Sequence, residues 1–404
     1  MIPKIAWRNI WRNRLRSFVV IGAIIMGIWA GIFMSSLSIG MTETRTQDIL
    51  DTFISHVQVH DSTFVYDHKP ADFIQNFEEV YGILQNDDSV TAITRRVIYS
   101  QAMLASAKGN RSVEIRGIYP EEERGITKLH EYIVDGNFFE EFKGKPVCIG
   151  AKIAEKNGYE VGDKLILQYQ DIHGEMHAVK YKVCGIFKTI NSQHDGFTVY
   201  VPAQTLFDET GDIMYHEIAL RTFNKSDALS LSNSLQAQLP DVKVEYWGQV
   251  SPDLGYTDEM MGVALLIYMG IIMLALMFGI INTMLMAVLE RTRELGMLMA
   301  VGMTKPKVFL MIVLETLFLS IVGGPLGILL GHLTVGYFGT NGLDLSVVAE
   351  GMSLFGMSSI VYTSIDPSAY IQIGIMVVVT ALLAALYPAR KALKLNPSEA
   401  IRSI

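Results

Sequence analysis

Four long stretches without charged side chains limit what this chain can fold into. Residues 17–39, 260–289 and 369–387 contain no Asp, Glu, Lys or Arg, and residues 308–339 contain only Glu315 and His332 as ionisable groups. A helix of about 20 apolar residues crosses the roughly 30 Å hydrocarbon core of a bilayer. The sequence therefore predicts a multi-pass membrane protein, in agreement with 50% hydrophobic and 18% charged residues over 404 positions.

The predicted spans are residues 17–40, 260–289, 308–339 and 369–388, and basic residues near them predict the orientation. Lys and Arg gather in residues 1–16, 290–307 and 389–404, whereas the loop at residues 340–368 has none. Because cytoplasmic loops carry the excess of Lys and Arg, both termini are predicted to be cytoplasmic. The first predicted span is too long for the apolar part of a signal peptide. The second would measure about 45 Å as a helix and should project from the bilayer as a stalk.

Residues 41–259 remain as one large domain outside the cytoplasm. They hold 20 Lys and Arg against 34 Asp and Glu, which excludes a nucleic-acid-binding surface. Alternating apolar residues predict strands, and a helical pattern covers Ala71–Gln85, so the domain is α+β. Two strand-helix-strand units bracket residues 120–215, and we expect those residues to form a separate outer lobe. The fold class is thus four transmembrane helices with a large α+β extracytoplasmic domain inserted between the first and second.

Residues 1–16 predict a basic amphipathic helix at the membrane surface. Trp7, Ile10, Trp11 and Leu15 share one face by their spacing, and Arg8, Arg12 and Arg16 follow a neighbouring stripe. Tryptophan rings at headgroup depth and arginines toward anionic lipid suit an elbow helix that leads into the first span. A basic tail that only sets the orientation is the alternative.

No residue set for catalysis, cofactor binding or metal binding can be defended from the sequence. Phosphate-loop, nucleophile-elbow and zinc-protease motifs are missing, and the nine histidines show no ligand spacing. Cys148 and Cys184 both lie in the exported domain, where either a disulfide or two buried thiols are allowed. Energy for work across the membrane must therefore come from another subunit or from an ion gradient.

The third span contains the polar and flexible positions that a membrane helix normally avoids. Glu315 lies about 10 Å from the cytoplasmic start of the span, so either pairing with a neighbour or a proton-coupled role is open. Gly323, Gly324 and Pro325 should kink or loosen the helix. Glycines at 327 and 331 allow close helix approach, either between two subunits or within one bundle.

A short charged-then-apolar run between the second and third spans predicts a surface helix within residues 290–307. Glu290, Arg291, Arg293 and Glu294 give it a charged leading edge, with Glu at the expected helix start. Leu295, Leu298, Met299 and Val301 form an apolar face, and Gly302 is a candidate C-terminal cap. Such a half-polar helix can dock into a groove of a cytosolic protein.

The run E-R-T-R-E-L-G-M-L-M-A-V-G at 290–302 resembles the FtsX-like permease family of ABC transporters. G-G-P-L-G-I at 323–328 and Y-P-A-R-K-A-L-K-L-N-P-S-E-A-I-R at 387–402 share the resemblance, and the layout of the whole chain agrees. In that family the first motif is the coupling helix that docks on the ATP-binding subunit. The resemblance implies that the contact residues are Glu290, Arg291, Arg293, Glu294, Gly296, Leu298, Ala300 and Gly302.

Overall size and the segments I-R-G-I-Y-P at 115–120 and I-G-A-K-I-A-E-K-N-G-Y-E-V-G-D-K-L at 149–165 resemble the LolC/LolE lipoprotein-releasing branch. The resemblance implies a bacterial inner-membrane permease subunit that transmits motion and is not itself an ATPase. Its expected protein partners are two cytosolic ATPase subunits, which hold ATP and Mg, and a second permease that is either identical or related. Membrane lipid and a lipoprotein or other exported cargo, with a periplasmic carrier, are also expected. Alternatives are a MacB-like efflux permease, a signalling scaffold and, more distantly, a proton-coupled carrier.

Overall fold

The computed structural model describes residues 2–106, 109–140 and 144–393, and the chain divides into two compact units. The first unit comprises Met1–Thr42, Glu259–Asp344 and Ile360–Ile404, and the second comprises Glu43–Asp258 and Leu345–Ser359. The predicted loop at residues 340–368 is therefore not one element, because its middle part folds with the second unit. There the amide of Ser192 donates to the carbonyl of Ser353 at 3.4 Å.

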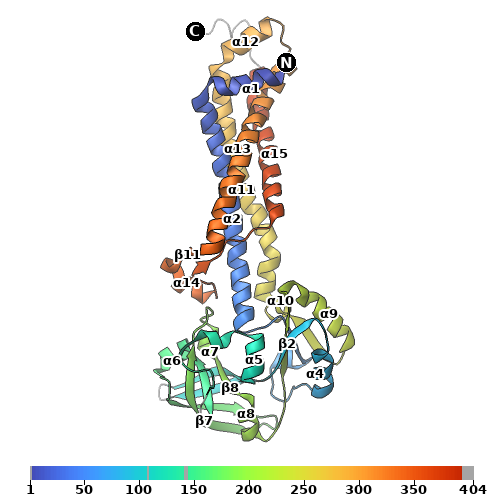
Figure 1. Ribbon diagram of the computed structural model, residues 1–404, viewed down its shortest axis with the longest axis vertical. Helices are drawn as coiled ribbons and strands as arrows, with labels where there is room; N and C mark the ends of the chain where they lie inside the picture. Colours follow the sequence, from blue (N-terminus) through green and yellow to red (C-terminus); the bar gives the residue numbers. More distant parts are fainter. Residues whose placement is uncertain (1, 107–108, 141–143, 394–404) are drawn as a thin grey trace. The chain divides into compact units, whose positions relative to one another are not determined.

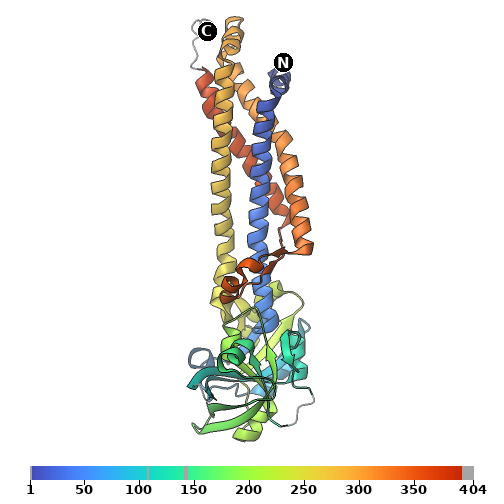
Figure 2. The ribbon, with the colours of Figure 1, turned by 90° about the vertical axis from the view of Figure 1, so that its left-hand side faces the viewer.

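Among the described residues, four helices are long and apolar enough to cross a membrane (Figures 1 and 2). They are α2 (Arg14–Thr52), α11 (Pro252–Glu290), α13 (Lys305–Asn341) and α15 (Pro367–Leu393). Two shorter helices, α1 (Ile2–Arg12) and α12 (Thr292–Ala300), and the hairpin of β11 (Leu343–Asp344) with β12 (Ile360–Val361) complete the first unit. Apolar residues of α1, α2, α11, α12, α13 and α15 share one buried cluster.

The helices run further than the uncharged stretches indicated. α2 continues twelve residues beyond the predicted end at residue 40, because the polar segment after Gly40 has no Gly or Pro and buries Thr46, Ile49 and Leu50. α11 begins at Pro252 rather than residue 260. Each has 39 residues and measures about 58 Å, so both, and not α11 alone, are longer than a bilayer core.

The second unit is built on one ten-stranded sheet. Its strands are β1 (Val57–Asp61), β2 (Val90–Ser106), β3 (Gly109–Ile118), β4 (Ile133–Gly136), β5 (Pro146–Gly150), β6 (Lys164–Gln170), β7 (Met176–Phe187), β8 (Thr198–Pro202), β9 (Glu217–Thr222) and β10 (Val242–Tyr246). The order is β10-β1-β9-β2-β3-β8-β5-β7-β4, with β6 paired to β2 and β7. The pairs β3–β8 and β5–β7 are parallel, and the other pairs are antiparallel.

Helices cover the sheet and fill its connections. They are α3 (Phe64–Asp67), α4 (Phe77–Gln85), α5 (Pro120–Ile126), α6 (Ala151–Asn157), α7 (His194–Phe197), α8 (Ala203–Thr210), α9 (Ala228–Gln238), α10 (Trp247–Val250) and α14 (Ala349–Leu354), with 3-10 turns at Leu129–Tyr132, Lys225–Asp227 and Ser346–Val348. The helix predicted from Ala71 starts only at Phe77, because the amide of Ile74 donates to the carbonyl of Tyr215 at 2.9 Å.

The predicted outer lobe at residues 120–215 starts too late, because the second half of β2 and all of β3 pair with its strands. The 17-residue strand β2 pairs through its first half with β9 and through its second half with β3 and β6, so it belongs to both parts of the sheet. β3 also pairs with β8, across the predicted boundary at residue 120. A single buried apolar cluster accordingly extends from Ile49 to Leu254 through both parts.

Candidate functional site at the junction of helices α1, α12 and α13

The surface helix predicted between the second and third spans exists as α12. Arg291 stands at its N-cap, and Glu290 is the last residue of α11 rather than the start of the new helix. Gly302 adopts a positive φ of 106°, the amide of Met303 donates to the carbonyl of Leu298, and the amide of Gly302 donates to that of Met299. These two bonds form a Schellman motif, so Gly302 ends the helix one position beyond its C-cap.

One face of α12 is buried and the opposite face is free. Leu295 and Gly296 are buried, whereas Arg291, Glu294 and Leu298 are half-buried. The exposed stripe lies at helical spacing and consists of Arg293, Met297 and Ala300, followed by Val301 with 89% of its surface exposed. α12 therefore presents a cation and apolar side chains together on a surface that no described residue covers.

Arg291 ties α12 to the third span. Its Nε donates to Glu294 at 3.0 Å, and its Nη1 lies 3.3 and 3.4 Å from the two oxygens of Glu315. Glu315 is 5% exposed and also accepts a 2.7 Å bond from the Nδ2 amide of Asn9 on α1. The carboxylate of Glu315 is thus paired with neighbouring side chains, which is the first of the two roles that the sequence left open.

Two further ion pairs join the N-terminal helices to the same junction. Arg12 on α1 pairs with Glu294 on α12, and Arg16 on α2 lies 3.8 Å from Glu290 on α11. Partial burial of Glu294 disfavours its charged form, but hydrogen bonds from Arg12 and Arg291 outweigh this and lower its pKa. Ion pairs thus link α12 to α1 and to α13, and α2 to α11, at one end of the bundle.

The elbow helix is shorter than predicted and buries a different face. α1 ends at Arg12. Beyond this end, the hydroxyl of Ser17 on α2 donates to the carbonyl of Ile10 at 2.5 Å. Ala6, Asn9 and Ile10 are the buried residues of α1. Leu15, predicted on the apolar face of this helix, belongs instead to α2. Sequence reasoning missed Asn9, because one amide in a basic segment gives no signal.

The predicted tryptophans remain largely at the surface of α1. Trp7 and Trp11 are 43% and 38% exposed, and their rings meet edge to face at 5.9 Å. Trp7 also contacts the ring of Phe318 on α13 at 5.6 Å. Arg8 is exposed and has no ion-pair partner among the described residues, in contrast to Arg12.

The glycines of α13 pack within this bundle. An added Cβ at Gly323, Gly327 or Gly331 would come within 2.8–3.0 Å of isoleucine side chains of α2, namely Ile24, Ile28 and Ile32. Gly324 faces open space, and α13 continues through Pro325 as one helix, although this residue has no amide N–H to donate. Close approach between helices of one chain thus uses three of these glycines.

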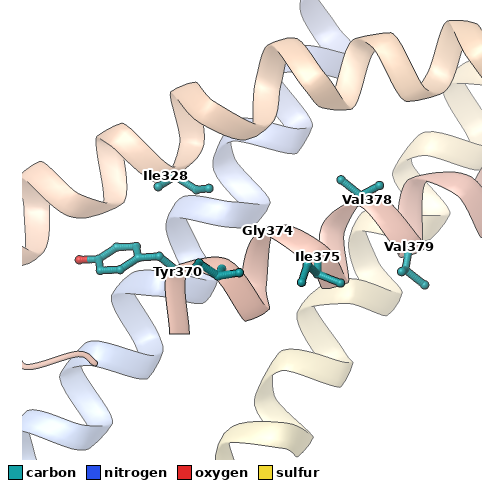
Figure 3. A pocket seen from close by; sticks show the side chains of 7 residues that line it. Ile328, Tyr370, Gly374, Ile375, Val378 and Val379 are labelled. Carbon is teal, nitrogen blue, oxygen red and sulfur yellow. The ribbon is translucent and has the colours of Figure 1, made fainter. Parts of the chain in front are cut away.

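An apolar groove runs between α13 and α15 on the surface of the bundle (Figure 3). It has a volume of about 480 Å³ and is lined by Ile328, Tyr370, Ile371, Gly374, Ile375, Val378 and Val379. His332 Nδ1 lies 3.3 Å from the hydroxyl of Tyr370 beside it. No charged side chain lines the groove.

In the second unit, a buried charge cluster holds the chain at the end of α2. Arg96 is 1% exposed, binds both oxygens of Glu123 at 2.6 and 3.0 Å, and donates to Glu217 at 2.5 Å. Arg96 and Arg116 both donate to the carbonyl of Phe53, just past the end of α2, at 3.5 and 3.4 Å. Although burial disfavours the charge of Glu217, Arg96 holds its pKa well below the ordinary value.

A second group of charges fixes the last turn of α2. Asp51 accepts from Lys128 and from Arg221, both at 2.8 Å, and the amide of Lys128 donates to the carbonyl of Asp51. Arg45 on α2 pairs with Asp253 at the start of α11. None of these residues was singled out from the sequence, because their partners are far apart in the chain.

The two cysteines are buried neighbours. Sγ of Cys148 on β5 lies 3.3 Å from Sγ of Cys184 on β7, and both are free thiols in the structure. Among the described residues, no group of three or more His, Cys, Asp or Glu side chains could hold a metal ion. The described geometry thus comprises a half-exposed short helix, a charged junction and a second unit that holds the end of α2.

Comparisons with known families agree with this layout. The model of the FtsX-like permease C-terminal family matches residues 266–397, and the model of the MacB-like periplasmic core domain matches residues 17–238, more than half of the chain. The lipoprotein-releasing system transmembrane protein LolC of Neisseria meningitidis is 24% identical, with 97% of this chain and 95% of LolC covered.

Export proteins that include an ATP-binding part are also similar. The pyoverdine export ATP-binding/permease protein PvdT of Pseudomonas syringae is 25% identical and the macrolide export protein MacB of Hahella chejuensis is 23% identical, each over 98% of this chain. The chain spans 58% and 59% of their lengths. The periplasmic region of MacB from Actinobacillus actinomycetemcomitans aligns at a TM-score of 0.35 and 13% identity over 51% of this chain and 95% of its own, too low to add to the assignment. By its family matches, the chain belongs to the FtsX-like permeases of ABC transporters and carries a MacB-like periplasmic core domain.

Proposed function

We propose that the chain is a permease subunit that transmits motion from a cytosolic ATPase to its exported unit. The observation that carries the proposal is α12, which exposes Arg293, Met297 and Ala300 while Arg291 ties it to Glu315. A helix with one free apolar and cationic stripe fits a groove of a partner protein. In this reading ATP and Mg are bound by two such partner subunits, and both chain termini face the cytoplasm.

The two long helices α2 and α11 supply the route for the motion. Each begins in one compact unit and ends in the other, and each is longer than a bilayer core. At the far end, the carbonyl of Phe53 is held by Arg96 and Arg116, so a shift of α2 is passed to the sheet. No cargo needs to cross the bilayer through the bundle.

A direct test separates docking from folding. Arg293→Glu reverses an exposed charge of α12 that has no ion-pair partner among the described residues. We expect normal insertion and melting but loss of binding to the ATPase subunit and of its stimulated turnover. Arg14→Glu, an equally exposed cation on α2, is the matched control. Unchanged turnover with Arg293→Glu would refute the docking role of α12. Glu294 is a poorer probe, because its reversal also breaks the pairs with Arg12 and Arg291.

For the cargo, we propose a lipid-modified exported protein. This chain covers 95% of the length of LolC but only 58% and 59% of PvdT and MacB, which supports a task similar to that of LolC. β6 alternates exposed and buried residues, and its exposed face carries Ile166. Met103 of β2 and Met176 of β7 are also exposed and pair with Gln168 and Gln170 of the same strand. A small-molecule efflux role, as named for MacB, is the second candidate, because the MacB-like core domain matches residues 17–238.

Photo-crosslinking distinguishes the two candidates. A photoreactive residue at Ile166 should trap an acylated protein in cells, whereas one at Phe223, which is 77% exposed on the loop after β9, should not. Mass spectrometry of the trapped protein reads out the acyl group. Absence of any acylated adduct at Ile166, together with reduced efflux of a small molecule on deletion, would favour the second candidate.

A further inference from the structure

A hollow lies where the elbow helix α1 meets the start of α13. Its volume is about 380 Å³, and it is lined by Ile2, Ile5, Met303, Lys307, Leu310 and Leu314. All of these side chains are apolar except that of Lys307, which is exposed. The hollow is thus an apolar surface with one cation and no anion.

The lining changes from charged to apolar along α13. Lys307, Leu310 and Leu314 are three and four residues apart, so they share one face of the helix. Leu314 lies about 10 Å further along the span than Lys307. A phospholipid has the same arrangement, because its phosphate stays at the interface and its acyl chain extends into the hydrocarbon.

The charges around the hollow favour an anionic occupant. The carboxylates at this end of the bundle, Glu290, Glu294 and Glu315, are paired with arginines. Among the described residues, the exposed cations Lys4, Arg8, Lys305 and Lys307 have no ion-pair partner.

A second hollow shares the lining residue Ile5 with the first. It measures about 620 Å³ and is lined by Trp7, Arg8, Asn9, Trp11 and Arg12 besides Ile5. Tryptophan is enriched at headgroup depth, where its ring meets apolar surface and its N–H meets water. Aromatic rings and the guanidinium of Arg8, unpaired among the described residues, therefore line a hollow that has Ile5 in common with the apolar one.

We propose that this hollow binds one anionic phospholipid of the bilayer, with an acyl chain against Ile5, Leu310 and Leu314 and its phosphate on Lys307. The larger groove between α13 and α15 (Figure 3) differs in that no cation lines it, so it has no means to select a headgroup. The lipid would brace α1 against α13 beside the Asn9–Glu315 bond. The site needs only a membrane location and is independent of the cargo.

The test uses the full-length protein in detergent, titrated with phosphatidylglycerol or phosphatidylcholine and followed by native mass spectrometry. We expect phosphatidylglycerol to bind more tightly and Lys307→Ala to weaken it about fivefold, the contribution of one cation near an anionic surface. Lys307→Arg should restore binding, and Leu310→Trp, which fills the hollow, should reduce it. Lys391→Ala is the control, because this exposed cation of α15 does not line the hollow.

Four results would overturn the proposal. Equal binding of the two lipids would remove charge selection, and an equal effect of Lys391→Ala would show only diffuse attraction. Displacement of the lipid by millimolar inorganic phosphate would show that the acyl chain is not held in the hollow. Unchanged lipid binding with reduced binding of the ATPase subunit in Lys307→Ala would assign the hollow to a protein partner.

Discussion

Replacement of Arg96 by methionine tests whether the buried charge cluster holds the end of α2. The side chain is of similar length, but Glu123 keeps only the 2.8 Å bond from Thr127 and Glu217 keeps His60 at 3.3 Å. Removing one partner of a buried ion pair typically costs about 3–5 kcal/mol, because the remaining charge is left without compensation. Arg96 donates to both carboxylates, whereas the nearby Arg116 pairs with Glu114, so we expect a loss near the lower end of this range.

Proton uptake limits this cost and makes it depend on pH. Keeping a glutamate neutral costs about 1.36 kcal/mol for each pH unit above its ordinary pKa of about 4.3, or about 3.7 kcal/mol at pH 7 and about 1 kcal/mol at pH 5. In Arg96→Met a buried carboxyl holds its proton longer than in the unfolded chain, so stability falls as the pH rises from 5 to 7. In the protein with Arg96, the dependence of stability on pH has the opposite sign, because the lowered pKa of Glu217 contributes stability that is lost on acidification.

Arg95→Met is the matched control on the neighbouring residue. Arg95 pairs with Glu122 at 3.2 Å, its side chain is 28% exposed, and its guanidinium lies 4.4 Å from the ring centroid of Tyr119. An exposed pair contributes at most about 1 kcal/mol, and a cation–π contact about 0.5–1 kcal/mol. We therefore expect a loss of about 1 kcal/mol that differs little between pH 5 and pH 7.

Thermal denaturation of the full-length protein, followed by protease cleavage within residues 43–258, measures the second unit. A loss of about 3–4 kcal/mol at pH 7 lowers the melting temperature by roughly 6–16 °C for a unit of this size. At pH 5 the difference should shrink to a few degrees. Equal shifts for the Arg95 and Arg96 variants, or the same shift at both pH values, would refute a buried cation between two carboxylates.

Two other predictions concern packing and thiol chemistry. Gly327→Ala places a Cβ 2.8 Å from Ile28 and should lower the stability of the bundle by about 1–3 kcal/mol. Gly324→Ala, whose added Cβ has nothing within 4 Å, should be neutral or stabilising. Equal melting temperatures of the two variants in detergent would contradict the packing. Cys148 and Cys184 should resist N-ethylmaleimide in the native protein, because burial raises the pKa of the Cys148 thiol, and both should react after denaturation by mass spectrometry. A pair that reacts only after addition of reductant would be a disulfide.

The sequence was sufficient for elements whose residues are neighbours in the chain. The four spans follow from runs without charge, and α12 follows from its local pattern and from Gly302, whose positive φ suits glycine. Strands in the second unit could be predicted as a class of element, because alternation is a local signal. The length of α2 was not predictable in this way, because its polar last turns are stabilised by burial in the second unit.

Contacts between distant residues could not be predicted from one sequence. Glu315 was identifiable as a costly intramembrane carboxylate, but its partners Asn9 and Arg291 lie in other segments and carry no signal of their own. Arg96 likewise looks like any strand residue until β2 and β9 bring it to Glu217. The continuous sheet through β2 was missed for the same reason, since pairing across 100 residues has no local pattern.

These contacts form one chain of close links from α12 to the sheet. Arg291 joins α12 to Glu315 of α13, and Gly327 of α13 lies against Ile28 of α2 with no room for a methyl group. α2 is continuous to Thr52, and Arg96 and Arg116 hold the next carbonyl. Packed elements of this kind shift as units and do not deform gradually, so a displacement of α12 reaches the sheet only if every link holds. A variant such as Gly327→Ala should then keep ATPase binding and lose stimulated release of cargo, whereas Arg293→Glu should lose both.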